Sequence, residues 1–78
     1  MKFKSFFNLE LGKNTNLYYD LLIEEDFDFK TKNIQIQIQK ENDSILNLNV
    51  LSDSIIDLKI GVNAVIKSLE IISKTLNV

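Results

Sequence analysis

The only side chains in this sequence that could do acid–base or nucleophilic chemistry are carboxylates, lysines, hydroxyls and two tyrosines. The 78 residues include 11 acidic and nine basic side chains, and neither histidine nor cysteine occurs. Histidine is the commonest general acid–base residue and a cysteine thiolate is a potent nucleophile, so the usual catalytic pairs are missing. Disulfides and the imidazole and thiolate ligands of zinc are missing as well. We therefore expect a protein that is not an enzyme and has no cofactor or metal.

The densest group of carboxylates lies between two apolar segments. Glu24, Glu25 and Asp26 are followed by a stretch that alternates acidic residues with Phe27 and Phe29. This pattern predicts a loop whose two phenylalanine rings tuck under the domain, and the alternative is an acidic docking segment for a basic surface. The two glycines of the chain stand far apart, so no glycine-rich phosphate-binding loop is present.

The charge of the chain bears on nucleic-acid binding. The formal net charge is −2, and all nine basic residues are lysines. Arginine is the usual residue for bidentate contacts to phosphates and bases, so tight autonomous nucleic-acid binding is not favoured. A small stand-alone RNA-binding module of KH-like class stays as the alternative function, although the G-x-x-G loop of that class is absent.

Three segments alternate between apolar and polar residues, with the period of two that is typical of a half-buried strand. They are residues 2–11, 33–40 and 45–51. The plainest segment alternates isoleucine with glutamine: Ile34, Gln35, Ile36, Gln37, Ile38 and Gln39. Polar residues 41–44 join the second segment to the third, which predicts an antiparallel hairpin.

Two further segments have apolar residues at helical spacing. Residues 17–26 place Leu17, Tyr18 and Leu21 near one face, with other apolar residues around the girth, which predicts a short helix covered on two sides. Residues 55–76 carry a continuous apolar row: Ile55, Leu58, Val62, Val65, Leu69, Ile72 and Leu76. The order βαββα predicts one α+β domain over residues 1–78, in two layers, with two helices on one face of a three-stranded antiparallel sheet.

The long helix carries a second apolar row, roughly opposite the first, at Ile56, Ile60 and Ile71. Small residues lie between the rows: Gly61, Ala64, Ser68 and Thr75. Glycine inside a helix costs about 1 kcal/mol relative to alanine, which indicates a packing reason for Gly61. We expect a partner protein to supply helices that pack against Ile56, Ile60, Gly61, Ala64, Ser68 and Ile71. The alternative is that the first helix of the same domain covers the second row.

A domain of this size without disulfides or a metal often gains stability by association. The isoleucine–glutamine strand is long, regular and free of proline, which suits pairing with another sheet. We expect Ile34, Gln35, Ile36, Gln37 and Ile38 to form a dimer strand, and the alternative is that its glutamines simply face water. No apolar run approaches the roughly 20 residues that span a bilayer, and no signal peptide is recognisable, so we expect a cytoplasmic protein without membrane contact.

Residues 52–69 resemble the final helix of the small Pcc-type subunit of the KEOPS complex. In that family the helix follows an acidic or hydroxyl residue and carries a Leu-Arg pair, a small residue, an Asn and a later Leu. Leu58, Gly61, Asn63 and Leu69 match this pattern, and Lys59 takes the place of the arginine. The length and the expected element order match the family as well. Lysine keeps the charge but makes no bidentate contact, so either a standard member or a divergent paralogue fits the pattern.

The resemblance implies a non-catalytic accessory subunit. Such subunits dimerise through their sheets, with a copy of themselves or with a paralogous small subunit. Their helices form a bundle with the catalytic transferase subunit, which makes threonylcarbamoyl adenosine in tRNA. The resemblance further implies that the subunit helps tRNA binding within the complex, with Lys59 as the possible tRNA contact.

Overall fold

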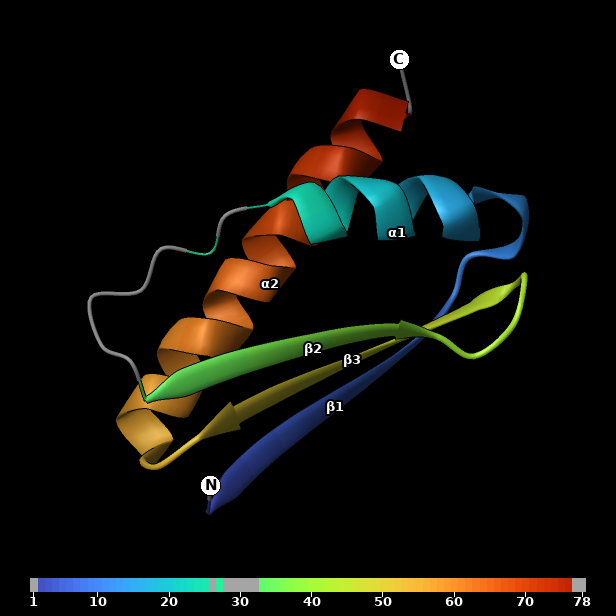
Figure 1. The fold of residues 1–78 in the computed structure, drawn as a ribbon. Helices are drawn as coiled ribbons and strands as arrows, with labels where there is room; N and C mark the ends of the chain where they lie inside the picture. Colours follow the sequence, from blue (N-terminus) through green and yellow to red (C-terminus); the bar gives the residue numbers. More distant parts are fainter. Residues whose placement is uncertain (1, 26, 28–32, 77–78) are drawn as a thin grey trace.

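The computed structural model describes residues 2–25, 27 and 33–76 and has an α+β fold. The elements, in chain order, are β1 (Phe3–Glu10), a 3-10 turn (Gly12–Asn14), α1 (Thr15–Glu24), β2 (Ile34–Lys40), β3 (Ile45–Ser52) and α2 (Ile55–Leu76). Figure 1 shows them in two layers, with both helices on the same side of the sheet. The expected βαββα architecture is therefore confirmed.

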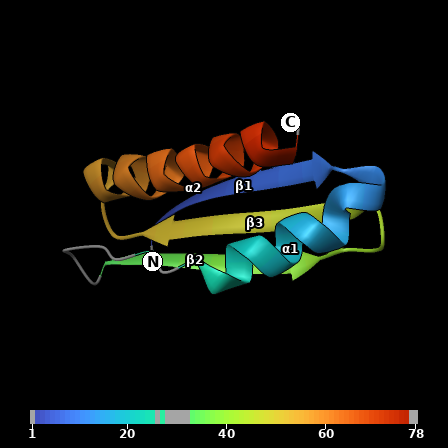
Figure 2. The same cartoon turned by 90° about the horizontal axis from the view of Figure 1, so that it is seen from above.

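The sheet is antiparallel throughout, and its strand order is β1-β3-β2. The central strand is thus the last one in the sequence, and β1 and β2 form the two edges. Helix α2 packs on all three strands, whereas α1 packs on β2 and β3. Seen from above in Figure 2, α2 runs alongside β1 and α1 lies on the side of β2.

The core forms where the helices meet the central strand. Leu46, Leu48 and Val50 alternate along β3 and are fully buried, as are Leu22 of α1 and Val65 of α2. Burying one such side chain stabilises the fold by about 1.5–3 kcal/mol relative to leaving it exposed. The isoleucines of β2 are only half-buried, although they pack against this core, because β2 is an edge strand.

Local hydrogen bonds fix the starts of the helices. Helix α2 begins after Ser54, whose Oγ accepts a hydrogen bond from the backbone N–H of Asp57 at 3.1 Å, which is an N-cap. The turn before α1 contains Gly12 with a positive φ of 57°, a conformation that favours glycine. The Thr15 hydroxyl donates to the Gly12 carbonyl oxygen at 2.8 Å and thereby ties the first turn of α1 to it.

The sheet face away from the helices is rich in amides. Asn8 of β1 donates a side-chain hydrogen bond to Asn47 of β3 at 3.1 Å, and the glutamines of β2 are exposed. Phe6 is the large apolar residue of this face that is most exposed. An antiparallel sheet with one covered and one polar face matches the alternation in the sequence.

The acidic segment after α1 is described only in part. Phe27 is half-buried and packs against the core, as expected for this ring. Asp26 and Phe29 lie outside the described residues. No helix in the described part of the chain is long and apolar enough to cross a membrane.

Candidate protein-docking surface

Helix α2 turns the predicted apolar row toward the sheet, except for Ile55 at its start, and two small residues join the most buried positions. Its buried residues are Gly61, Val65, Ser68 and Ile72. Ile55, expected in the core row, is 59% exposed. The buried row is therefore rotated toward the small residues, and Leu58, Val62, Leu69 and Leu76 flank it half-buried.

Position 61 requires a small residue because the sheet, and not a partner protein, lies close against it. A Cβ at this position would lie 2.7 Å from Val50 Cγ1 and 2.9 Å from Ile34 Cγ2, well inside contact distance. The expectation that Gly61 meets a partner helix is therefore wrong: its Cα packs directly on β3 and β2. Ser68, two turns later, is 8% exposed and belongs to the same buried row, so its expected partner contact is wrong for the same reason.

The second apolar row is exposed in the part of the domain that the structure describes. Ile56, Ile60 and Ile71 are 74%, 46% and 56% exposed. The alternative that α1 covers this row is therefore wrong. Ala64 lies beside the row and is half-buried. Each of these isoleucines presents apolar surface to solvent, and together they form one stripe along α2.

Helix α1 also turns an unexpected face inward. Its buried residues are Thr15, Tyr18 and Leu22, whereas Leu17 and Leu21 are exposed. Of the three residues that were expected to share one face of this helix, only Tyr18 is buried. A polar residue enters the buried row here because its hydroxyl is satisfied by the carbonyl of the preceding turn.

The contacts of Lys40 show which flank of α1 faces the outer edge of β2. The Lys40 ammonium donates to Asn16 Oδ1 at 2.9 Å and lies 5.3 Å from the centroid of the Tyr19 ring. At about 100° per residue, Leu17 and Leu21 lie roughly opposite Tyr19. Because β2 is at one edge of the sheet and α2 lies on the other side of α1, these two leucines are on the flank toward α2.

The contacts of Gly61 likewise show which flank of α2 faces α1. Its contact with Ile34 places it on the side of the buried row that leans toward β2, and α1 lies above β2. Turning further around the helix in that direction reaches Ala64, then Ile71, then Ile60. The uncovered stripe of α2 thus lies on the flank toward α1.

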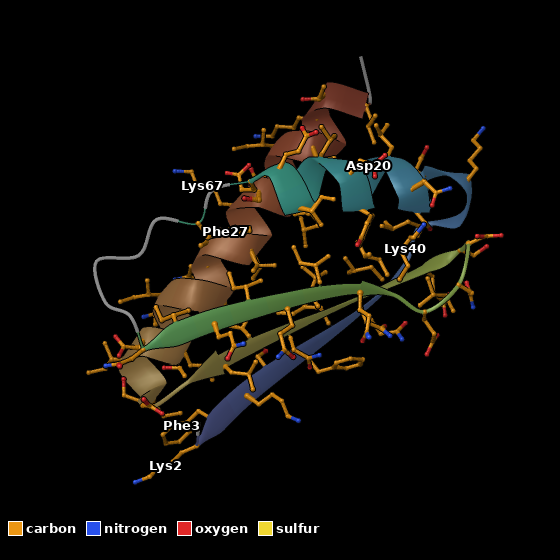
Figure 3. The ribbon with its side chains drawn as sticks, in the orientation of Figure 1. Lys2, Phe3, Asp20, Phe27, Lys40 and Lys67 are labelled. Atoms are coloured by element: carbon orange, nitrogen blue, oxygen red, sulfur yellow. The ribbon has the colours of Figure 1, made fainter. Side chains whose placement is uncertain are left out.

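Exposed apolar side chains consequently lie on the flanks of α1 and α2 that face each other, and the two helices also contact each other directly. We call these side chains together the helix-face surface, which comprises Leu17, Leu21, Ile56, Ile60, Ala64 and Ile71. Charged residues of opposite sign border it, Asp20 on α1 and Lys67 on α2, both exposed and both labelled in Figure 3. Sequence reasoning missed Leu17 and Leu21 as surface residues, because the period of α1 does not show which row meets the sheet.

The remaining expected site residues lie elsewhere. Gln35 and Gln37 are exposed on the amide-rich face, whereas Ile34, Ile36 and Ile38 are half-buried under the helices. Lys59 is exposed on α2, roughly opposite the buried Gly61 and thus on the side away from the sheet. Among the residues that the structure describes, no group of three or more acidic side chains could hold a metal ion.

Comparisons of the chain with protein-family models, with curated proteins and with solved structures gave no match. The class of protein that the fold and this surface define is therefore a small α+β domain whose helix layer carries exposed apolar residues.

Proposed function

We propose that the chain is a non-catalytic accessory subunit that docks on a larger protein through the helix-face surface. The observation that carries the proposal is the pair of exposed apolar stripes on neighbouring helices. Ile60 and Ile71 lie inside the long helix α2 yet are 46% and 56% exposed, although their flank faces α1. A partner helix laid across the outer sides of α1 and α2 would cover residues of both stripes at once.

The partner that best fits this surface is the catalytic transferase subunit of a KEOPS-type complex, in the cytoplasm. The resemblance of residues 52–69 to the small Pcc-type subunit and the βαββα fold support this choice. In this role the chain supports threonylcarbamoyl adenosine modification of tRNA without chemistry of its own. It dimerises with a copy or with a paralogous small subunit, and tRNA is touched only weakly, through Lys59.

The structure changes which part of α2 would meet the transferase. Gly61 and Ser68 support contact only indirectly, because they let α2 lie close to the sheet. The residues that would contact the transferase directly are Ile56, Ile60, Ala64 and Ile71 of α2, together with Leu17 and Leu21 of α1. A partner helix of mixed charge would also meet Asp20 and Lys67 at the border.

The test measures capture of the purified transferase subunit by the purified chain, with light scattering to give the mass of the complex. Ile60→Glu should reduce capture at least tenfold, since it sets a charge into a surface that becomes buried. Ile23→Glu is the matched control: Ile23 is 53% exposed, close to the 46% of Ile60, but lies on the flank of α1 that carries Tyr19.

Both variants should keep the stability of the parent chain within about 0.5 kcal/mol, because neither side chain is buried. If Ile60→Glu captures the transferase as well as Ile23→Glu does, the helix-face surface is not the docking site. If the parent chain captures no transferase but binds RNA with a steep dependence on salt, the KH-like alternative is correct and the accessory role is wrong.

A further inference from the structure

Two stretches of the sheet are free of charged side chains. Residues 33–39, in β2, and residues 44–52, in β3, contain only aliphatic, amide and serine side chains, and the chain has no proline. Short segments with high β-propensity, low net charge and no proline can stack in register into a cross-β fibre. Strand β1 differs, because Lys4 and Glu10 lie within it.

Of the two stretches, residues 33–39 are the more uniform. The side toward the helices carries isoleucine alone and the other side carries glutamine alone. Rows of identical isoleucines from two sheets can interdigitate without water. Glutamine amides both donate and accept hydrogen bonds, so they form ladders along a stack of identical strands. Strand β3 lacks this uniformity, because Ile45 and Leu51 share its outer side with asparagines.

In the folded domain the isoleucine side of β2 is covered. Its three isoleucines are half-buried and pack against the core, on the side of the sheet where Figure 1 shows both helices. The close approach of Gly61 to Ile34 shows that α2 lies directly on this side. The isoleucines can therefore meet those of another copy only after the helix layer has left the sheet.

Charged residues bound the segment on its C-terminal side. Lys40 ends β2, and Glu41 and Asp43 follow in the turn. Strands in an in-register stack repeat every 4.7–4.8 Å or so, so each of these positions would place like charges above one another. A stacked core thus ends at Gln39. In the folded state the Lys40 ammonium is bonded to Asn16 of α1, so the residue that bounds the segment also holds a helix over it.

We propose that unfolded copies of this chain assemble into a cross-β fibre whose core is residues 33–39. The isoleucines form a dry interface between two sheets, and the glutamines form ladders along the fibre. A domain of 78 residues without disulfides is marginally stable, so some chains are unfolded at equilibrium and expose both sides of the segment. The helix layer keeps folded chains out of the fibre, and the inference is independent of the docking function.

Agitated incubation of the full chain tests the proposal, at the urea concentration that unfolds half of the molecules. Thioflavin T fluorescence should rise after a lag, and the product should give fibre reflections at about 4.7–4.8 Å and about 10 Å. Gln37→Lys should lengthen the lag about tenfold or more, because it stacks a like charge in every layer of the core. Each variant is measured at its own urea midpoint, so that the unfolded fraction is equal.

Asn63→Lys is the matched control. It makes the same change in charge at an exposed position of α2, outside the proposed core, and should not lengthen the lag. Both substitutions bring the net charge of −2 closer to zero, which by itself favours general association. A longer lag for Gln37→Lys alone would therefore run against the general trend and locate the core in β2. Mass spectrometry of protease-treated fibres should find a resistant fragment that contains residues 33–39.

The dependence on unfolding is tested in buffer without urea. A variant that loses one to two kcal/mol of stability has about 5–30 times more unfolded chain, and its lag should shorten accordingly. A lag that ignores the unfolded fraction, a precipitate without the two reflections, fibres that form equally fast with Gln37→Lys and Asn63→Lys, or a resistant fragment without residues 33–39 would each overturn the proposal. Transferase capture is measured on the folded chain, so either proposal can fail while the other stands.

Discussion

Replacement of Gly61 by alanine should destabilise the domain, although the same exchange on an open helix surface would stabilise it. The added methyl group would lie 2.7 Å from Val50 Cγ1 and 2.9 Å from Ile34 Cγ2. Both neighbours are branched at Cβ and therefore stiff, and Val50 is fully buried. The crowding is relieved only if α2 moves away from the sheet or the two strands shift.

The magnitude follows from two opposed effects. Alanine stabilises a helix by about 1 kcal/mol relative to glycine. Overpacking of a well-filled core typically costs about 1–3 kcal/mol, and two close contacts with stiff side chains point to the upper part of that range. We expect Gly61→Ala to lower the free energy of unfolding by about 1–2 kcal/mol. In a domain of this size, each kcal/mol corresponds to roughly 4–8 °C in Tm.

Urea denaturation followed by circular dichroism measures this change, with Asn63→Ala as the control. Asn63 is exposed on the same helix, so its replacement should raise stability by a few tenths of a kcal/mol through helix propensity alone. In a Val50→Ala background the cost of Gly61→Ala should shrink, because one of the two crowding methyl groups is gone. Gly61→Ala that stabilises as Asn63→Ala does, or that costs the same in both backgrounds, would refute the close-approach reasoning.

Three further substitutions test the local contacts of the fold. Ser54→Ala removes the N-cap of α2 and should lower the free energy of unfolding by about 1 kcal/mol, measured by urea denaturation, and Ser54→Asp should restore most of it. Thr15→Val leaves the Gly12 carbonyl without its hydroxyl partner and should cost about 1–2 kcal/mol; an unchanged urea midpoint would contradict this role. Lys40→Met removes the hydrogen bond and the ring contact that join β2 to α1, and a loss of about 0.5–1 kcal/mol is expected, with hydrogen exchange faster in α1 than in α2.

The positions of the elements follow from side-chain periods, but the exact rotation of each helix about its own axis does not. Helix α2 spans Ile55–Leu76, as its apolar spacing predicts. A period shows which residues share a row, yet it does not show which row meets the sheet. That choice depends on how closely the helix approaches, and here Gly61 and Ser68 permit an approach that a row of isoleucines would prevent.

The same limit applies to the candidate surface. The sequence indicates that α2 has more apolar residues than one contact requires, and Ile56, Ile60 and Ile71 are indeed exposed. It gives no sign that Leu17 of α1 is exposed, because that depends on the placement of α1 over β2 through Lys40. A contact between residues distant in sequence therefore decides which side chains of a short helix remain at the surface.

The strand order has a consequence for the order in which the chain can fold. The first strand lies against the last one, and the bonded pair Asn8 and Asn47 is separated by 39 residues. The β2–β3 hairpin needs only a short loop to close, so its entropy of closure is much smaller than that of β1. During synthesis β1 has no strand to pair with until β3 has left the ribosome. We expect pulse-labelled amides of the hairpin to gain protection before those of β1, so that β1 joins the sheet last.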